Sequence, residues 1–346
     1  PDEVVVTWVR GNILLESKSF KPTSTKFFLK AKVENFQEIT IEMKKSMKPF
    51  QSTKIKSLTF GKIFEWEDDD LSSGSVNEEV DTTGATLPIN TATFEIVDRD
   101  NDFNVINPNG IWKSVLPNKE MIITEYVNGK EVPIGYFYLK TWANKDNVTS
   151  FELQDRIGLL DEIKFVGGMY ENEYASKIIE RIIDTARATA DRKTWPLDCY
   201  NISPVFADVK LSGYLPIMSC REALHQVAFA MNAVVDDSRG DKINIYPPDR
   251  NVDSYILTSR KFSGGTVAEL DDYVSGVTIA CKKYVAKSES TEIFRGTLEK
   301  GEHRIEFSQP YTSLNVTNAR IEADGANFVF VKLTQTAEVV INGVGF

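Results

Sequence analysis

Histidine is the side chain that most often performs acid–base chemistry near neutral pH, and only two of the 346 residues of this chain are histidine. His225 lies in a segment whose apolar spacing predicts a helix, where a position flanking the core is favoured over a catalytic one. Cys220 precedes it by five residues, which puts the two side chains on different sides of a helix, because helical neighbours are three or four residues apart. His303 follows a predicted exposed turn and is expected to be solvated. Neither histidine therefore predicts a nucleophile–base pair.

One segment is similar to the beginning of a calcium-binding loop. Asp98, Asp100, Asp102 and Asn104 offer oxygens at positions one, three, five and seven. The pattern then fails, because Phe103 stands where such a loop needs glycine and the position of the bidentate glutamate is also not acidic. We predict a strand-to-loop exit here, without a metal ion.

The three cysteines, Cys199, Cys220 and Cys281, are too widely spaced for a zinc pattern or a disulfide framework. Cys220 and Cys281 lie in apolar segments and are predicted to be buried thiols. This cysteine usage favours folding in a reducing cytosol.

The remaining candidates for chemistry carry little weight. Acid pairs such as Glu152 with Asp155, or Asp161 with Glu162, are expected by chance among 50 acidic residues. No glycine-rich phosphate loop is present in the sequence, and Arg239-Gly240-Asp241 is interpreted as a hairpin tip at which glycine supplies the positive φ. We therefore assign no catalytic, cofactor-binding or metal-binding residue and predict that the chain is not an enzyme.

The charge distribution limits the classes of partner. The net charge of −10, from 40 basic and 50 acidic residues, argues against a protein that grips nucleic acid by its phosphates. Residues 1–64 carry a net charge of +6, whereas residues 65–81 carry eight acidic and no basic side chains.

No apolar run is long enough to span a bilayer, and the acidic first residues predict no secretory signal or stable membrane insertion.

Alternating apolar residues predict strands in the first half of the chain. Examples are Ile39, Ile41 and Met43, and the series from Phe27 to Val33 before them. Residues 67–86 are acidic and without periodicity, and we predict a long exposed loop. A strand carrying Ala92, Phe94 and Ile96 on one face is expected next. Predicted strands follow at Glu120–Val127, Val132–Trp142 and Val148–Gln154, with Asn128-Gly129 as a hairpin turn.

The pattern changes near Gly167. A spacing of four among apolar residues predicts a helix over residues 171–190. A second helix is expected to begin at Ser219, which with Glu222 forms a capping box. Two short strands around residues 236–241 follow this helix. The middle region is therefore predicted to be α+β, with two helices on a small sheet.

Strand patterns return after residue 250. The segments that fit short strands are Val274–Ala286, Glu292–Leu298, His303–Phe307, Val316–Ala323, Asn327–Leu333 and Glu338–Ile341. Six strands in so short a stretch indicate a small barrel or sandwich. The sequence thus predicts a β-rich α+β protein with two small β-barrel-like domains, residues 1–165 (with a strand-rich N-terminal extension) and 251–346, flanking a middle α+β domain, residues 166–250.

Two stretches resemble the tail hub proteins of phages. Residues 213–246, GYLPIMSCREALHQVAFAMNAVVDDSRGDKINIY, are similar to the middle domain of baseplate hubs of contractile phages and of the N-terminal structural module of siphophage tail-associated lysins. Residues 87–104, followed by Pro133–Trp142 and the strand at Phe151, are similar to the first barrel of such hubs. The succession β, α+β, β covers nearly the whole chain.

The resemblance implies a structural role without cofactors. Hubs of this family are homotrimers whose paired barrels form a pseudo-sixfold ring between the tail tube and the tip. The implied partners are tail tube and distal tail proteins, the tape-measure protein, and tip spike or fibre proteins, while DNA passes through the channel without specific binding. The implied location is the virion tail tip, assembled in the bacterial host cytoplasm. An acidic channel wall would repel phosphates.

Two alternatives remain open. One is a cell-wall hydrolase, acting on peptidoglycan or another glycan through an acid pair that the sequence does not mark. The other is a carbohydrate-binding receptor protein of the tail tip, because the five tryptophans, Trp8, Trp66, Trp112, Trp142 and Trp195, could stack on sugars. Core packing is the favoured interpretation of those tryptophans.

Overall fold

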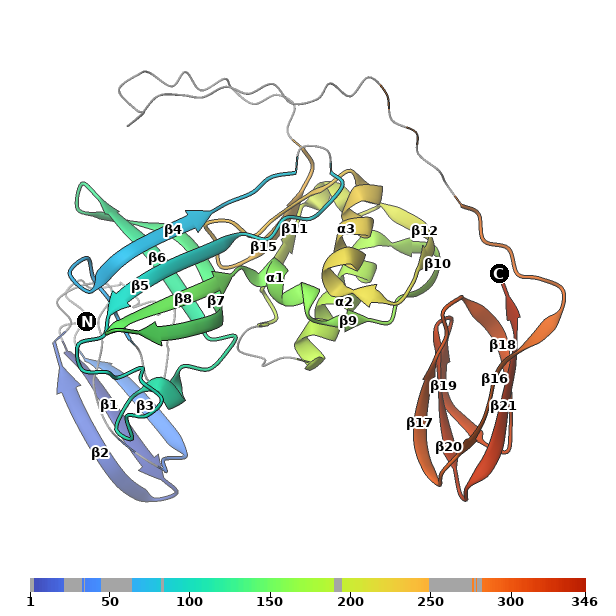
Figure 1. Cartoon of the computed structure of the whole chain (residues 1–346), viewed down its shortest axis with the longest axis horizontal. Coiled ribbons are helices and arrows are strands. Elements are labelled where there is room, and N and C mark those ends of the chain that lie inside the picture. Colours follow the sequence, from blue (N-terminus) through green and yellow to red (C-terminus); the bar gives the residue numbers. More distant parts are fainter. Residues whose placement is uncertain are drawn as a thin grey trace. The chain divides into compact units, whose positions relative to one another are not determined.

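The structure, a computed structural model, describes residues 3–21, 33, 35–44, 64–81, 84–189, 195–248, 276, 278 and 282–346. The chain divides into two compact units, Pro1–Glu65 and Trp66–Phe346. Figure 1 traces the elements of each unit in chain order.

The first unit contains one antiparallel sheet of three strands. These are β1 (Glu3–Arg10), β2 (Ile13–Phe20) and β3 (Glu38–Lys44), in the order β2-β1-β3. Val4, Val6 and Trp8 alternate along β1 and are buried, with Ile39, Ile41 and Met43 packed against them. The predicted strand at residues 38–44 is thus confirmed. The series from Phe27 to Val33 lies almost entirely outside the described residues.

The second unit begins with a five-stranded antiparallel sheet in the order β4-β5-β8-β7-β6. Its strands are β4 (Leu71–Asn77), β5 (Thr91–Val97), β6 (Glu120–Val127), β7 (Lys130–Lys145) and β8 (Val148–Gln154). The predicted hairpin turn between β6 and β7 is confirmed, since Asn128 and Gly129 both have positive φ. β6 and β8 have the predicted bounds.

Aromatic side chains cover one face of this sheet. Phe94 and Phe151, cross-strand partners on β5 and β8, stack with ring centroids 4.7 Å apart. Phe103, from the irregular segment after β5, is buried and meets Phe151 edge-on. That segment contains the short 3₁₀ helix Trp112–Ser114. The core therefore lies between the sheet and the segment that follows β5.

The predicted irregular loop at residues 67–86 is wrong, because β4 lies inside it and pairs with β5. Every residue of β4 is exposed, so the strand shows no alternation of apolar and polar residues. An edge strand exposed on both faces has no hydrophobic period from which it could be recognised.

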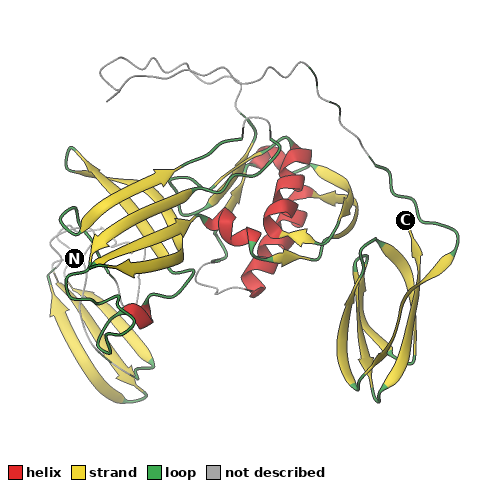
Figure 2. Cartoon of the chain, in the orientation of Figure 1, coloured by secondary structure: helices red, strands yellow, loops and turns green. Residues whose placement is uncertain are grey.

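An α+β region follows, in which helices lie beside short strands (Figure 2). The helices are α1 (Arg156–Asp161), α2 (Ala175–Thr189) and α3 (Cys220–Met231). The strands are β9 (Lys164–Phe165), β10 (Gly168–Tyr174), β11 (Tyr200–Ile202), β12 (Lys210–Leu215), β13 (Met218–Ser219), β14 (Val234–Asp236) and β15 (Ile243–Tyr246), with a 3₁₀ helix at Pro204–Phe206. Apolar faces of α2 and α3 share one buried core with Trp195 and Ile243.

Two predictions for the helices need correction. Residues 171–174 are not helical, because Glu173 and Tyr174 pair with β12 and α2 begins only at Ala175. The short helix α1 was not expected at all. The capping box is confirmed, since Ser219 and Glu222 exchange both capping hydrogen bonds.

The C-terminal part forms a sandwich of two three-stranded sheets, ordered β16-β21-β18 and β17-β20-β19. Its strands are β16 (Ser290–Leu298), β17 (Gly301–Glu306), β18 (Tyr311–Thr317), β19 (Arg320–Gly325), β20 (Phe328–Leu333) and β21 (Ala337–Gly345). The single predicted strand Val316–Ala323 is wrong, because the chain turns at Asn318, whose φ is positive. Most of the predicted strand Val274–Ala286 lies outside the described residues, and residues 282–286 are not in a strand.

The protein is accordingly a β-rich α+β protein, as the sequence predicts. The boundaries proposed between residues 165 and 166 and between residues 250 and 251 stay predictions.

Candidate functional site

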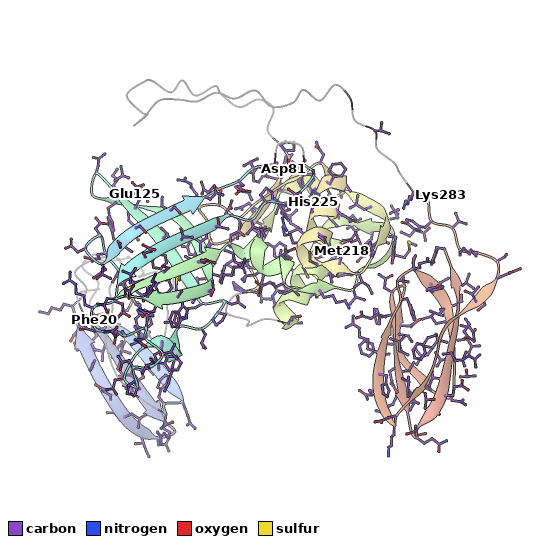
Figure 3. All side chains as sticks on the ribbon, in the orientation of Figure 1. Phe20, Asp81, Glu125, Met218, His225 and Lys283 are labelled. Carbon is purple, nitrogen blue, oxygen red and sulfur yellow. The ribbon has the colours of Figure 1, made fainter. Side chains whose placement is uncertain are left out.

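The segment between β4 and β5 lies against the α+β region. We call residues 78–81 and 84–90 the strap. Leu87 of the strap is buried in the core shared by α2 and α3, and its carbonyl accepts a hydrogen bond from Nε of Arg221 at 2.7 Å. Farther along α3, Nε2 of His225 lies 2.9 Å from the carbonyl oxygen of Gly84. Figure 3 labels His225, together with Asp81 of the strap.

The beginning of the strap is held by the turn between β14 and β15. Arg239 in that turn pairs with Glu78 at 3.1 Å. The predicted role of Gly240 is wrong, because Arg239 has the positive φ in this turn (+57°) and Gly240 does not. Arg239-Gly240-Asp241 thus forms a turn engaged within the chain.

A buried polar cluster lies beside the strap, where the five-stranded sheet meets the α+β region. Its centre is Arg156, the first residue of α1, which is 2% exposed. One guanidinium nitrogen donates to the hydroxyl of Tyr138 on β7 at 2.6 Å, and the other donates to the carbonyl of Asp241 at 2.9 Å. The backbone N–H of Arg156 donates to Oδ2 of Asp237 at 2.8 Å. We call Tyr138, Asp155, Arg156 and Asp237 the junction cluster.

The ion pair within the junction cluster is incompletely satisfied. Oδ1 of Asp237 is 3.5 Å from a guanidinium nitrogen of Arg156, beyond hydrogen-bonding distance for this pair. Among the described residues, neither Oδ1 of Asp237 nor Nε of Arg156 has a hydrogen-bond partner. The guanidinium is thus held mainly by a neutral hydroxyl and a carbonyl, and the carboxylate gains only part of the compensation that a buried charge needs.

Asp155 ties the strap to the cluster. One oxygen accepts the N–H of Gly158 at 2.9 Å and thereby caps α1, and the other accepts the N–H of Asn90, at the end of the strap, at 2.9 Å. Asp155 is 1% exposed. Strand β8, helix α1 and the strap are therefore joined through a single carboxylate.

Burial dominates the electrostatics of these groups. It raises the pKa of Asp237 to about 7 against the attraction of Arg156, and the nearby charge of Asp155 acts in the same direction as burial. Burial also raises the pKa of Asp155 to about 6, against the hydrogen bonds from Asn90 and Gly158. The pKa of Tyr138 is raised for the same reason. Burial acts to lower the pKa of Arg156, but Tyr138 and Asp237 outweigh it.

Raised carboxyl pKa values are a feature of catalytic acids. Here both carboxyl groups are enclosed, at 1% and 5% exposure, so a glycan does not reach them in this structure. A surface cavity of about 330 Å³ lies at the strap, lined by Glu79, Asp81 and Arg221 among others, but Asp155 and Asp237 do not line it. The junction cluster therefore contains buried ionisable groups and links the five-stranded sheet to the α+β region. It does not present an acid to this cavity.

The other face of the five-stranded sheet is polar. Ser73 and Ser150 each donate to a different oxygen of Glu95, at 3.0 and 3.1 Å, across three strands. Ser75 and Thr93 share a hydrogen bond of 2.8 Å one row further along. These residues lie opposite to the aromatic face, because side chains alternate along each strand.

The histidines and cysteines that the sequence offered for nucleophilic catalysis form no catalytic pair among the described residues. Cys220 is fully buried, and burial raises the pKa of its thiol to about 12. His225 is half-buried at the strap, so the two form no catalytic pair. His303, predicted to be solvated, is half-buried, and its ring lies 2.8 Å from the carbonyl of Glu299. Cys199 is also buried, whereas Cys281 lies outside the described residues.

Asp98 is a structural residue. It is 5% exposed and accepts hydrogen bonds from the backbone of Asp102 and Phe103 and from the side chain of Asn144. In the described ranges, no three His, Cys, Asp or Glu side chains are grouped so that they would hold a metal ion. The tryptophans are all buried or half-buried, and Trp195 is completely enclosed.

Tyr138, Arg156 and Asp237 were not predicted from the sequence as members of a site. Arg156 carried a local signal, because it is a single charge beside an apolar run, Ile157 to Leu160, after an aspartate suited to N-capping. Asp237 carried none, since it stands in a polar turn that is typical of solvated residues.

None of the helices in the described part of the chain combines the length and apolar character that a membrane span requires.

No protein-family model matches the chain, and no curated protein matches its sequence. Among solved structures, the chain is similar to the tail protein from Neisseria meningitidis MC58, with 14% sequence identity and a TM-score of 0.31. The match covers 51% of this chain and 50% of that protein, so the chain spans about half of its length.

Proposed function

We propose that this chain is a non-enzymatic structural protein of a phage tail, or of a tail-derived particle, and that three copies form the hub between tube and tip. The observation that carries the structural role is the junction cluster. Arg156 and Asp237, the most deeply buried charged pair in the described part of the chain, connect the sheet to the α+β region. Such a network fixes the orientation of two parts of a fold, which a load-transmitting assembly protein requires.

The assignment to a tail hub rests on the sequence stretches at residues 87–104 and 213–246. The order of elements within them supports the proposal: the Ser219-capped helix α3 is followed by β14, a turn and β15. A trimer of such chains would present paired β domains to a sixfold tube through one repeated interface. The partners would be tube, distal tail, tape-measure and tip proteins, at the tail tip of the virion.

The polar face of the five-stranded sheet is our candidate for the channel wall. Hydroxyl groups and the carboxylates of Glu95 and Glu152 occupy it, and negative charge repels the phosphates of passing DNA. Replacing both glutamates by lysine should slow DNA ejection. The same charge change at exposed Glu171 and Glu289 is the matched control and should have little effect.

The decisive experiment is a reconstruction of the assembled tail tip, with light scattering of the concentrated chain beside it. We expect a ring of three copies with a net acidic channel. A stable dimer, or a channel lined mainly by lysine and arginine, would contradict the proposal.

The hydrolase alternative is favoured only by the raised pKa values of Asp155 and Asp237. Clearing of a cell-wall zymogram that Asp237→Asn abolishes would establish it instead, and binding of the chain to host polysaccharide would support a receptor role.

A further inference from the structure

The junction cluster encloses an imbalance of charge. Two carboxyl groups, of Asp155 and Asp237, lie near one guanidinium group, of Arg156, with almost no exposure to solvent. With both carboxylates ionised, the junction cluster has a net charge of −1, and the cation outside it that acts on Asp155 is the partly exposed Arg221. Burying such a charge is costly, and the usual outcome is that one carboxyl group takes up a proton.

The surroundings of Asp237 offer little to balance that charge. The charged and titratable groups that act on it are Arg156 and Asp155, from α1 and its N-cap, and Asp236 of β14. On the far side of Arg156 lie Tyr138 of β7, whose hydroxyl is 3.4 Å from Glu120, and the thiol of Cys199. Arg156 is the cation of this set. Each of the other groups is neutral when protonated and negative when ionised. Asp237 is consequently the member that gains most by protonation.

We propose that the junction between the five-stranded sheet and the α+β region is a proton-dependent coupling, which tightens when Asp237 takes up a proton and loosens when it is ionised. The contact most directly affected is the hydrogen bond from the N–H of Arg156 to Asp237. Opening of the junction breaks this bond and exposes the amide and the carboxyl group to water. This inference does not depend on the proposed function.

The direction follows from linkage. The pKa of Asp237 is about 7 in the closed junction, and in an opened one it approaches the ordinary value near 3.8. A group that binds its proton more tightly in the closed state favours that state as the pH falls. When the pH falls from 8 to 6, the equilibrium constant for closing the junction should therefore rise about tenfold. Asp155, with a pKa of about 6, adds about twofold over the same interval.

Hydrogen exchange of the Arg156 amide in the full chain tests this inference. After correction for the intrinsic exchange rate, the opening constant should be about tenfold or more larger at pH 8 than at pH 6. In Asp237→Asn, which imitates the protonated side chain and keeps an acceptor for the amide, the ratio should fall to about twofold. Asp208→Asn removes an exposed carboxylate in the same region and should keep the wild-type ratio.

A second measurement does not depend on any variant. In wild-type protein labelled with carbon-13 at aspartate side chains, the carboxyl resonance of Asp237 should titrate with a midpoint well above 5. The inference is overturned if that carboxyl group stays ionised down to pH 5, if the wild-type ratio is close to one, or if Asp237→Asn leaves the ratio unchanged.

Discussion

Removal of the Ser219 hydroxyl is the most direct test of how α3 is held. Its oxygen accepts the N–H of Glu222 at 3.1 Å, and Glu222 in return accepts the N–H of Ser219 at 3.1 Å. The same hydroxyl donates to Asp161, the last residue of α1, also at 3.1 Å. Ser219→Ala therefore leaves a first-turn amide of α3 without its cap and removes a link between two helices.

The cost of losing an N-cap is typically about 1 kcal/mol, with a range of roughly 0.5–2 kcal/mol. The bond to Asp161 adds little, because the Asp161 side chain is 42% exposed and water replaces it. We expect the free energy of unfolding to fall by about 1–2 kcal/mol and the melting temperature to fall by about 2–4 °C for each kcal/mol. Urea unfolding followed by tryptophan fluorescence provides the assay, because one of the five tryptophans, Trp195, shares a core with α3.

Ser203→Ala is the matched control. Ser203 precedes the 3₁₀ helix Pro204–Phe206, where no side-chain capping bond is found among the described residues. Its replacement should change the free energy of unfolding by less than about 0.5 kcal/mol. If Ser219→Ala costs no more than this control, the capping box does not stabilise α3 and the reasoning fails.

Two further changes probe a tight backbone contact in the link between β9 and β10, and the junction cluster. Gly167→Ala should destabilise the protein by more than about 1 kcal/mol, since Gly167 has a φ of +70° and an added Cβ would lie 2.0 Å from the carbonyl oxygen of Leu215. Thermal unfolding measures this, and Gly129→Ala, with a similar φ but open space, isolates the backbone contribution. Tyr138→Phe should cost about 1–3 kcal/mol, because a guanidinium nitrogen of Arg156 loses its acceptor in a buried site. Urea unfolding checks this against Tyr126→Phe, because Tyr126 is 71% exposed and its hydroxyl has water as a partner, and equal costs would contradict a role for the buried hydroxyl.

The elements that could be predicted from the sequence carry either a buried face or a local signal. β8 has the predicted bounds, since its residues alternate between buried and less buried positions up to Leu153. β6 has the predicted bounds although none of its residues is buried, because the Asn128-Gly129 turn marks where it ends. The beginning of α3 is marked by a local hydrogen-bonding pattern that needs no tertiary context. β4 was missed because it is an edge strand with both faces exposed, and α2 was extended too far because Glu173 and Tyr174 suit a helix locally but pair with β12.

The junction cluster is beyond prediction for a different reason. Its members come from positions 138, 155, 156 and 237, and their meeting is a consequence of how the sheet and the α+β region pack. The acidic segment 65–81 was expected to be solvated, and its acidic residues up to Glu79 are exposed. The pairing of Glu78 with Arg239, at the point where the strap begins, was not predicted.

The use of buried charge at this junction bears on what the protein is built to do. Apolar contact alone would hold the sheet against the α+β region, but it is non-directional and tolerates sliding. Arg156 is positioned instead by directional hydrogen bonds to Tyr138, Asp237 and Asp241, although its Nε and Oδ1 of Asp237 have no hydrogen-bond partner among the described residues. A chain that must hold one sheet against an α+β region would gain from such a network, whereas an enzyme would gain from exposing the same carboxyl groups to a substrate. The enclosure of Asp155 and Asp237, at 1% and 5% exposure, is consistent with the structural role that we propose.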